Sequence, residues 1–461
     1  MGLNFISNLV LARLLLPSDY GTIGMLHIFI GVSSVFVTAG FGMALVQKKN
    51  PTHIDFTSVF YWNLVASIVF YFILFLCGPA ISRFYAMPEL CTILRVQSLS
   101  LIIQSFSTVQ SCLLQKQLRF KELAVRNLIA TLVGTIIGIV MAYKGLGVWS
   151  LVVSHLVSIL SAVLLLWKMS AWRPTWEFSW KSLKDLFSFG GLMALSSLVE
   201  TIYNNIQGLI IGKWFSPSDL GYYTQAKKLE TVPTDALSQV VNQVSFPVFS
   251  KLQDDRSRLV SGVRKNITSI TYINFPIMLL LIVIAKPVIT FLYGIKWIES
   301  VPYLQILCLA GAIYTMNTIN TNVIKSLGKS KVFFIIQLVK RVLGVIFIFV
   351  SIRWGVIGLM WAITSYSYMS LLINCFVNKK LIDYGLFAQI KDVSKNGIVS
   401  VVSAASAYLL CFLPIHEYII MAMQILAFCV VFLLLSWWWK LEGYCVFSTI
   451  LKQYVNRLIR K

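Results

Sequence analysis

The feature that most constrains the fold of this chain is a series of long apolar runs joined by short polar loops. A helix needs about 20 mostly apolar residues to cross a membrane. The sequence holds fourteen runs of roughly this length, in groups of six, six and two, at about 1–16, 23–46, 57–77, 92–114, 124–143, 147–167, 187–212, 221–247, 269–292, 302–324, 332–352, 355–377, 397–413 and 418–439. Only 12% of the residues are charged, against about 25% in a soluble domain. The pattern predicts an all-α polytopic membrane protein with about fourteen transmembrane helices.

Positive charges gather in every second loop. The loops after the second, fourth, sixth, eighth, tenth and twelfth runs include Lys48, Lys116, Arg173, Arg258, Lys329 and Lys380. Basic loops stay in the cytoplasm, so we expect these loops and both chain ends to be cytoplasmic. The net charge of +22 then reflects topology and attraction to anionic lipid head groups, and we expect no nucleic acid as a partner.

A short motif at the end of the first run occurs again 200 residues later. LARLLLPSDYG ends at Gly21, and IGKWFSPSDLG ends at Gly221. Two more pairs follow in the same order, GPAISRFY (78–85) with KPVITFLY (286–293) and KGLGVWSL (144–151) with RWGVIGLMWAI (353–363). Three pairs of similar segments in the same order indicate an internal duplication. Because each copy holds six runs, both copies start on the same side of the membrane, and parallel repeats of this kind occur in two-lobed transporters.

The duplication divides the chain into three parts. We expect a six-helix lobe at 1–180, a second at 181–385, and two extra helices with a basic cytoplasmic tail at 386–461. The second copy has about 17 more helix residues ahead of its motif than the first. The sixteen residues before Pro17 would give a helix of about 24 Å, shorter than the ~30 Å hydrocarbon layer. We therefore expect that the first helix is truncated; a short helix held by its neighbours is the alternative.

The repeated motif itself predicts a rigid turn on the periplasmic side. Proline ends one helix, serine or aspartate caps the next, and glycine permits a tight turn. The turn residues are Pro17, Asp19, Gly21, Pro217, Asp219 and Gly221. We expect their role to be structural, with service as pivots as a further hypothesis.

Several other stretches carry a family resemblance. They are GFGMALVQKK (40–49), VQSCLLQKQLRFKELA (109–124), GLGVWSLV (145–152), SPSDLGYYTQAKKLETVP (216–233), FPVFSKLQDD (246–255) and LYGIKW (292–297). With the repeated motif, they resemble the Wzx-type polysaccharide flippases of the multidrug/oligosaccharidyl-lipid/polysaccharide (MOP) flippase superfamily, and most of all their colanic and teichuronic acid exporter branch.

This resemblance implies a MATE-like fold of two six-helix lobes and two appended helices. It also implies a function in surface polysaccharide biosynthesis, the movement of an undecaprenyl-diphosphate-linked oligosaccharide across the bacterial cytoplasmic membrane by alternating access. The expected partners are that lipid-linked oligosaccharide, membrane lipids and the polysaccharide polymerase machinery. No cofactor is implied, and coupling to a proton or sodium gradient stays open.

A cargo with a diphosphate and sugars needs a polar, cationic cavity, because unsatisfied polar groups are costly in hydrocarbon. Polar and charged residues inside the predicted helices are therefore site candidates. They are Asn4, Gln110, Arg126, Glu200, Asn204, Gln207, Asn320, Gln337, Lys340 and Arg341, with Gln104 and Asn317 beside two of them. Arginine can grip a phosphate through two hydrogen bonds, and lysine adds a point charge. The alternative for the amides is helix–helix packing, and for Lys340 and Arg341 it is snorkelling to the membrane surface.

Two other function classes compete with a flippase. A multidrug or cation antiporter of the same fold should have an acidic cavity, whereas the intramembrane charges lean basic, with Glu200 the main exception. A membrane polymerase or ligase should carry catalytic residues in a large outward loop, but the longest such loop, about 78–91, offers only Arg83 and Glu89. The cysteines and histidines show no metal-ligand spacing. We expect a transporter with no enzymatic activity and no metal.

Overall fold

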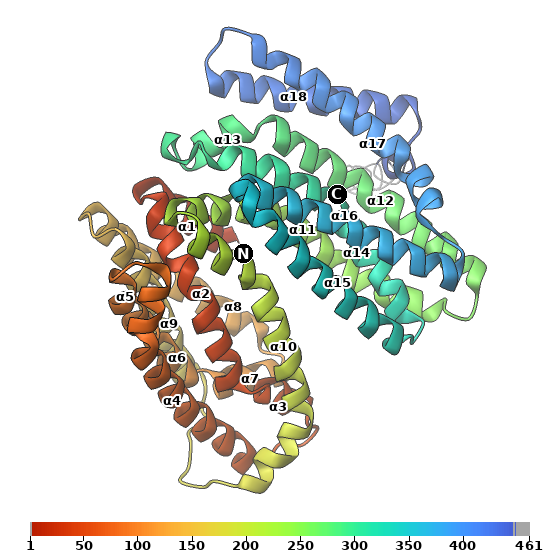
Figure 1. Cartoon of the computed structure of the whole chain (residues 1–461). Coiled ribbons are helices and arrows are strands. Elements are labelled where there is room, and N and C mark those ends of the chain that lie inside the picture. The colour runs from red at the N-terminus through yellow and green to blue at the C-terminus, as the bar shows by residue number, and fades with distance from the viewer. Residues whose placement is uncertain (1, 446–447, 449–461) are drawn as a thin grey trace, which may run out of the picture. The chain divides into compact units, whose positions relative to one another are not determined.

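The structure is a computed structural model that describes residues 2–445 and 448 (Figure 1). The predicted basic tail beyond residue 448 lies outside the described residues. Throughout the described chain the regular elements are α-helices and short 3-10 helices. The helices form two compact units, residues 1–224 and 225–461. The division into 1–180, 181–385 and 386–461 is a division by repeat and stays a prediction.

Unit 1 is built from ten helices and the first turns of an eleventh. They are α1 (Gly2–Leu14), α2 (Pro17–Thr38), α3 (Phe41–Gln47), α4 (His53–Tyr85), α5 (Glu89–Gln97), α6 (Leu99–Ser105), α7 (Thr108–Lys116), α8 (Phe120–Tyr143), α9 (Val148–Met169), α10 (Trp180–Trp214) and the start of α11 (Pro217–Lys251). Helices α8 and α9 pack together along an extended contact, and α10 packs against α2, α3 and α4. Small residues permit this packing, since a Cβ added at Gly134 would lie only 2.6 Å from the Ser154 carbonyl oxygen.

In its described residues, unit 2 contains the rest of α11 and seven further α-helices with three short 3-10 turns. They are α12 (Arg256–Val283), α13 (Ala285–Leu292), η1 (Ile295–Trp297), α14 (Ser300–Ser326), α15 (Ser330–Ser351), η2 (Ile352–Trp354), α16 (Gly355–Ile382), α17 (Leu386–Leu409), η3 (Leu410–Phe412) and α18 (Glu417–Trp438). Its core joins α12, α14 and α16 through buried apolar side chains such as Val263, Ile319 and Cys375. Helix α17 covers α12, and α18 packs on α17.

Each of the fourteen predicted runs coincides with a helix or a group of helices. Nine helical segments of the described chain are long and apolar enough to cross a membrane, with α15 and α16 counted together as 331–382. The α5–α7 group adds a broken span bent by 42°. The helices of three predicted runs do not pass this test: α1 has only 13 residues, and α11 and α14 carry many polar side chains. The predicted all-α polytopic membrane fold is confirmed.

Candidate functional site

The two copies of the repeated motif open α2 and α11, and both copies lie in unit 1. Pro17 and Pro217 are the first residues of their helices, where the missing N–H removes no helical hydrogen bond. The Asp19 carboxylate accepts a hydrogen bond from the Leu16 N–H at 2.8 Å. The Asp219 carboxylate accepts from the backbone N–H and the hydroxyl of Ser216, at 3.1 and 2.7 Å. Each motif is therefore a capped helix start.

The two motifs touch each other at their glycines. A Cβ added at Gly21 would lie 1.7 Å from the Pro217 carbonyl oxygen, and a Cβ at Gly221 would lie 1.9 Å from the Pro17 carbonyl oxygen. Any side chain at either position would therefore collide with backbone. We call this reciprocal contact the twin-glycine contact. It explains why both copies carry glycine at the same place, which a turn alone does not require.

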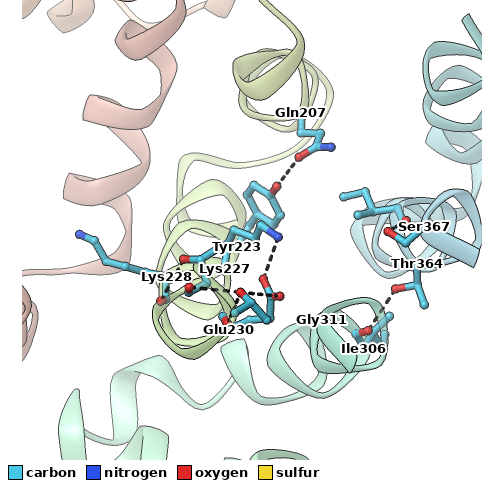
Figure 2. Close-up of polar contacts among 12 residues, drawn as sticks. Gln207, Tyr223, Lys227, Lys228, Glu230, Ile306, Gly311, Thr364 and Ser367 are labelled. Atoms are coloured by element: carbon cyan, nitrogen blue, oxygen red, sulfur yellow. Dashed lines mark hydrogen bonds and ion pairs between the residues drawn. The ribbon is translucent and has the colours of Figure 1, made fainter. Parts of the chain in front are cut away.

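Small residues continue this close approach along α2 and α10. Gly40 has a positive φ of 71° and faces the backbone of Gly190. A Cβ added at Gly40 would lie 2.0 Å from the Gly190 carbonyl oxygen. A Cβ added at Gly31 would lie 3.0 Å from the Thr201 methyl carbon. The predicted polar face of α10 does not take part in this contact between α2 and α10, because Glu200 and Asn204 are exposed in unit 1. Gln207 is partly buried and accepts a hydrogen bond from the Tyr223 hydroxyl at 2.5 Å (Figure 2).

A polar pocket of about 660 Å³ lies among α1, α6, α8 and α9, and we call it the Arg126 pocket. Two predicted site residues, Asn4 and Arg126, line it together with Gln104, although they come from helices far apart in the sequence. The Thr131 hydroxyl donates to the Asn4 side-chain oxygen at 2.9 Å, which ties α8 to α1. Ser107 enters the lining because α6 and α7 are broken at this point.

The Arg126 guanidinium is held by neutral groups. It donates to the Ser111 hydroxyl at 3.1 Å and, through two nitrogens, to the Asn127 side-chain oxygen at 3.1 and 2.5 Å. Among the described residues, no carboxylate forms an ion pair with it. A half-buried cation with only neutral partners is the feature expected of a site that receives an anion.

Gln110 lies apart from this pocket. It is fully buried between α7 and α9. With its amide nitrogen donating to the Phe106 carbonyl at 2.7 Å, its oxygen accepts from the Trp167 indole N–H at 3.3 Å. The side chain thus joins helices in the way that the packing interpretation requires.

Unit 2 holds the second predicted cation site, on α15. Lys340 is 5% exposed, and its ammonium donates to the Asn374 side-chain oxygen at 3.2 Å. Asn374 in turn donates to the Asn317 side-chain oxygen at 2.9 Å. Gln337 and Arg341 lie beside Lys340 on α15 and are partly exposed. Lys340 is thus a buried ammonium whose hydrogen-bond partner in the described chain is a neutral amide.

Asn320 belongs to a different group, a closed cluster of buried amides. Its side chain exchanges two hydrogen bonds with Gln389, at 2.9 and 2.8 Å, and accepts a third from Asn378 at 2.6 Å. All three side chains are fully buried. The cluster ties α14 to α16 and α17, which is a structural role.

Replacing Asn320 with leucine is expected to destabilise the protein by about 2–3 kcal/mol, because the buried side chains of Gln389 and Asn378 would lose their hydrogen bonds to the Asn320 side chain. Thermal unfolding in detergent measures the effect. Thr318→Val on the same helix is the control, since the Thr318 hydroxyl bonds only within its own helix, to the Tyr314 carbonyl. Unchanged stability combined with lost transport would instead place Asn320 in the cargo path.

The sequence reasoning missed an ion pair on α11 whose carboxylate is buried. The Glu230 carboxylate is almost fully buried and pairs with the Lys227 ammonium at 2.8 Å (Figure 2). The Thr234 hydroxyl donates to the backbone carbonyl of Glu230 at 3.0 Å. Gly311 of α14 leaves room for the carboxylate, since a Cβ there would lie 2.5 Å from its oxygen. The signal was available, because charged residues inside an expected membrane helix mark functional candidates.

The comparisons with known proteins identify the family. A family model described as polysaccharide biosynthesis protein matches residues 10–302, more than half of the chain. The chain belongs to the polysaccharide biosynthesis protein family. Among the relatives, the teichuronic acid biosynthesis protein TuaB of Bacillus subtilis is 23% identical over 82% of this chain and 78% of its own length. The succinoglycan biosynthesis transport protein ExoT of Rhizobium meliloti is 28% identical over 74% of this chain and 69% of its own length.

Solved structures define the fold of this family member. The lipid II flippase MurJ, in an inward closed conformation, matches with a TM-score of 0.75 and 16% identity, over 95% of this chain and 97% of MurJ. An inward-facing multidrug resistance MATE family transporter matches with a TM-score of 0.62 and 15% identity, over 83% of this chain and 96% of the transporter. The MATE-like fold predicted from the sequence is confirmed.

In this family member, each unit offers a cation that donates hydrogen bonds to neutral side chains. Arg126 supplies it in unit 1, and Lys340 supplies it in unit 2. In the part of the chain that the structure describes, no cluster of three histidine, cysteine or acidic side chains could hold a metal ion. The arrangement suits the binding of an anionic, hydroxyl-rich molecule.

Proposed function

We propose that the protein is a flippase that moves an undecaprenyl-diphosphate-linked oligosaccharide across the bacterial cytoplasmic membrane for surface polysaccharide biosynthesis. Family membership supports the biosynthetic setting, and the names of ExoT and MurJ describe a transport protein and a lipid flippase. The observation that carries the proposal is a pair of cations, Arg126 and Lys340, that lie inside helices of an apolar membrane protein and form no ion pair with a carboxylate of the described residues. Such cations can replace the water that anionic groups of the cargo lose.

The proposed orientation places both termini and the basic loops in the cytoplasm. The cargo enters from that side and leaves to the periplasmic side by alternating access. Membrane lipids and the polymerase that consumes the exported unit are the proposed partners. The protein performs no bond chemistry in this scheme, and we assign it no cofactor.

The proposal is tested by deleting the gene and analysing the lipid-linked sugars of the cell. We expect a complete repeat unit to accumulate on the cytoplasmic leaflet, because synthesis continues while transfer stops. Leaflet location is measured by the access of an added, membrane-impermeant sugar-modifying enzyme to the lipid-linked sugar in sealed vesicles. Unchanged amounts and location of the lipid-linked sugars would falsify the proposal.

The alternative function with the same fold is multidrug antiport, which the structural similarity to a MATE family transporter suggests. That likeness concerns the fold alone. The Arg126 pocket disfavours a cationic cargo, because a guanidinium lines it and no acidic side chain does. Unchanged resistance to cationic drugs in the deletion strain, together with accumulated lipid-linked sugars, is the expected result.

A further inference from the structure

We propose that the Arg126 pocket binds an acidic sugar of the cargo, a glycosyl residue that carries a carboxylate. This inference rests on the proposed flippase function and adds to it the class of sugar that the protein selects. It assigns the pocket to the carbohydrate part of the cargo, separate from the lipid diphosphate.

The first argument is the hydrogen-bonding capacity of Arg126. A guanidinium has five N–H donors in a planar fork, and three of them are taken up by Ser111 and Asn127. Two donors are left for a ligand. A carboxylate accepts two hydrogen bonds from such a fork and also neutralises the charge, which neither Ser111 nor Asn127 can do.

The second argument is the chemistry of the remaining wall. Around the guanidinium the pocket has hydroxyl and amide groups from Asn4, Gln104, Ser107, Thr131 and Ser158. These groups both donate and accept hydrogen bonds, as sugar hydroxyls require. Ile159 and Ala162 add apolar surface for the C–H faces of a ring. A diphosphate would need more positive charge than the single cation that lines this pocket.

The third argument is size and position. A volume of about 660 Å³ lies in the range of small-molecule pockets, about 300–1,000 Å³, so the pocket takes one part of the oligosaccharide. Arg126 is about 9 Å along α8 from Phe120, at 1.5 Å per residue. The loop just before α8 holds Arg119, follows Lys116 at the end of α7, and is among the proposed cytoplasmic loops. The pocket is therefore placed to receive the sugar on the loading side.

The test uses the full-length protein in lipid nanodiscs and ligand-observed NMR with three soluble probes. The probes are methyl β-D-glucuronide, its neutral counterpart methyl β-D-glucoside, and inorganic pyrophosphate. We expect the glucuronide to bind at least about 10-fold more tightly than the glucoside, the ratio that one charge-assisted pair adds. Equal binding of the two sugars would overturn the inference, and so would binding of pyrophosphate alone.

Two variants assign the binding to the pocket. Arg126→Gln is expected to remove the preference for the glucuronide. Asn127→Asp keeps the side-chain shape and gives Arg126 an internal carboxylate, so we expect it to abolish the preference while the protein stays folded. The control is Lys121→Gln, which removes an exposed charge of α8 outside the pocket. Full preference for the glucuronide in the Asn127→Asp protein would contradict the assignment.

The outcome is separable from that of the flippase proposal. If deletion causes lipid-linked sugars to accumulate but the probes show no preference for acid, only the acidic-sugar inference fails. If the glucuronide binds as expected but the lipid-linked sugars are unchanged by deletion, the flippase proposal fails and the pocket remains a site for an acidic sugar.

Discussion

Gly21→Ala and Gly221→Ala are each expected to lower polysaccharide export at least about 10-fold while the protein level in the membrane stays normal. The added methyl group would overpack the contact and destabilise, by about 1–3 kcal/mol, the transporter conformation that contains it. A single methyl group at either position would meet a backbone carbonyl oxygen at 1.7 or 1.9 Å. The twin-glycine contact can then form only with displaced helices. A transporter that needs this contact in one of its states would lose that state.

Gly42→Ala is the matched control for this prediction. It also adds one methyl group to a glycine of a unit 1 helix, but the new Cβ would meet the Cys112 sulfur at 3.4 Å and the Thr108 methyl group at 3.9 Å, which are ordinary contact distances. Surface polysaccharide is measured in deletion cells that carry each variant, with the membrane level of the protein as the reference. Full export by both Gly21→Ala and Gly221→Ala would show that the twin-glycine contact is unnecessary for transport.

The double change Lys340→Ala with Arg341→Ala is expected to lower export at least about 10-fold, because it removes both cations proposed for the diphosphate in unit 2. The matched control is Lys329→Ala with Lys331→Ala, which removes two exposed charges at the start of the same helix. Export is measured in the same complementation assay. Normal export by the Lys340/Arg341 double variant would refute the anion-site assignment.

Lys340→Gln separates charge from packing at this site. Glutamine can still donate a hydrogen bond to Asn374, the partner of Lys340 at 3.2 Å, but it carries no charge. We expect Lys340→Gln to fold normally and to export poorly. If it exports as well as the natural protein, Lys340 serves only to join α15 to α16.

The resemblance to polysaccharide flippases and the positions of the helices were predictable from the sequence. Hydropathy is a local property, since a segment of about 20 apolar residues enters a membrane as a helix whatever its neighbours are. This is why the runs at 124–143 and 147–167 coincide with α8 and α9 within a few residues. The charge of alternate loops is equally local, and the proposed orientation depends on it.

The roles of the polar residues depend on partners that are distant in the sequence. Asn4 and Arg126 share a pocket because α1 packs on α8, while Asn320, selected by the same reasoning, is enclosed by Gln389 and Asn378. A polar side chain in a membrane helix has either a protein partner or a ligand. Which of the two it has is decided by the helix that crosses it.

The repeated motif shows the same division. The sequence by itself determined that the motif occurs twice and that each copy would start a capped helix, because proline and aspartate act on the turn that contains them. Only the tertiary structure decided that each glycine lies against the backbone of the other copy. The physical reason is that the space around a Cα atom is set by helix packing, and here the two packed segments are about 200 residues apart.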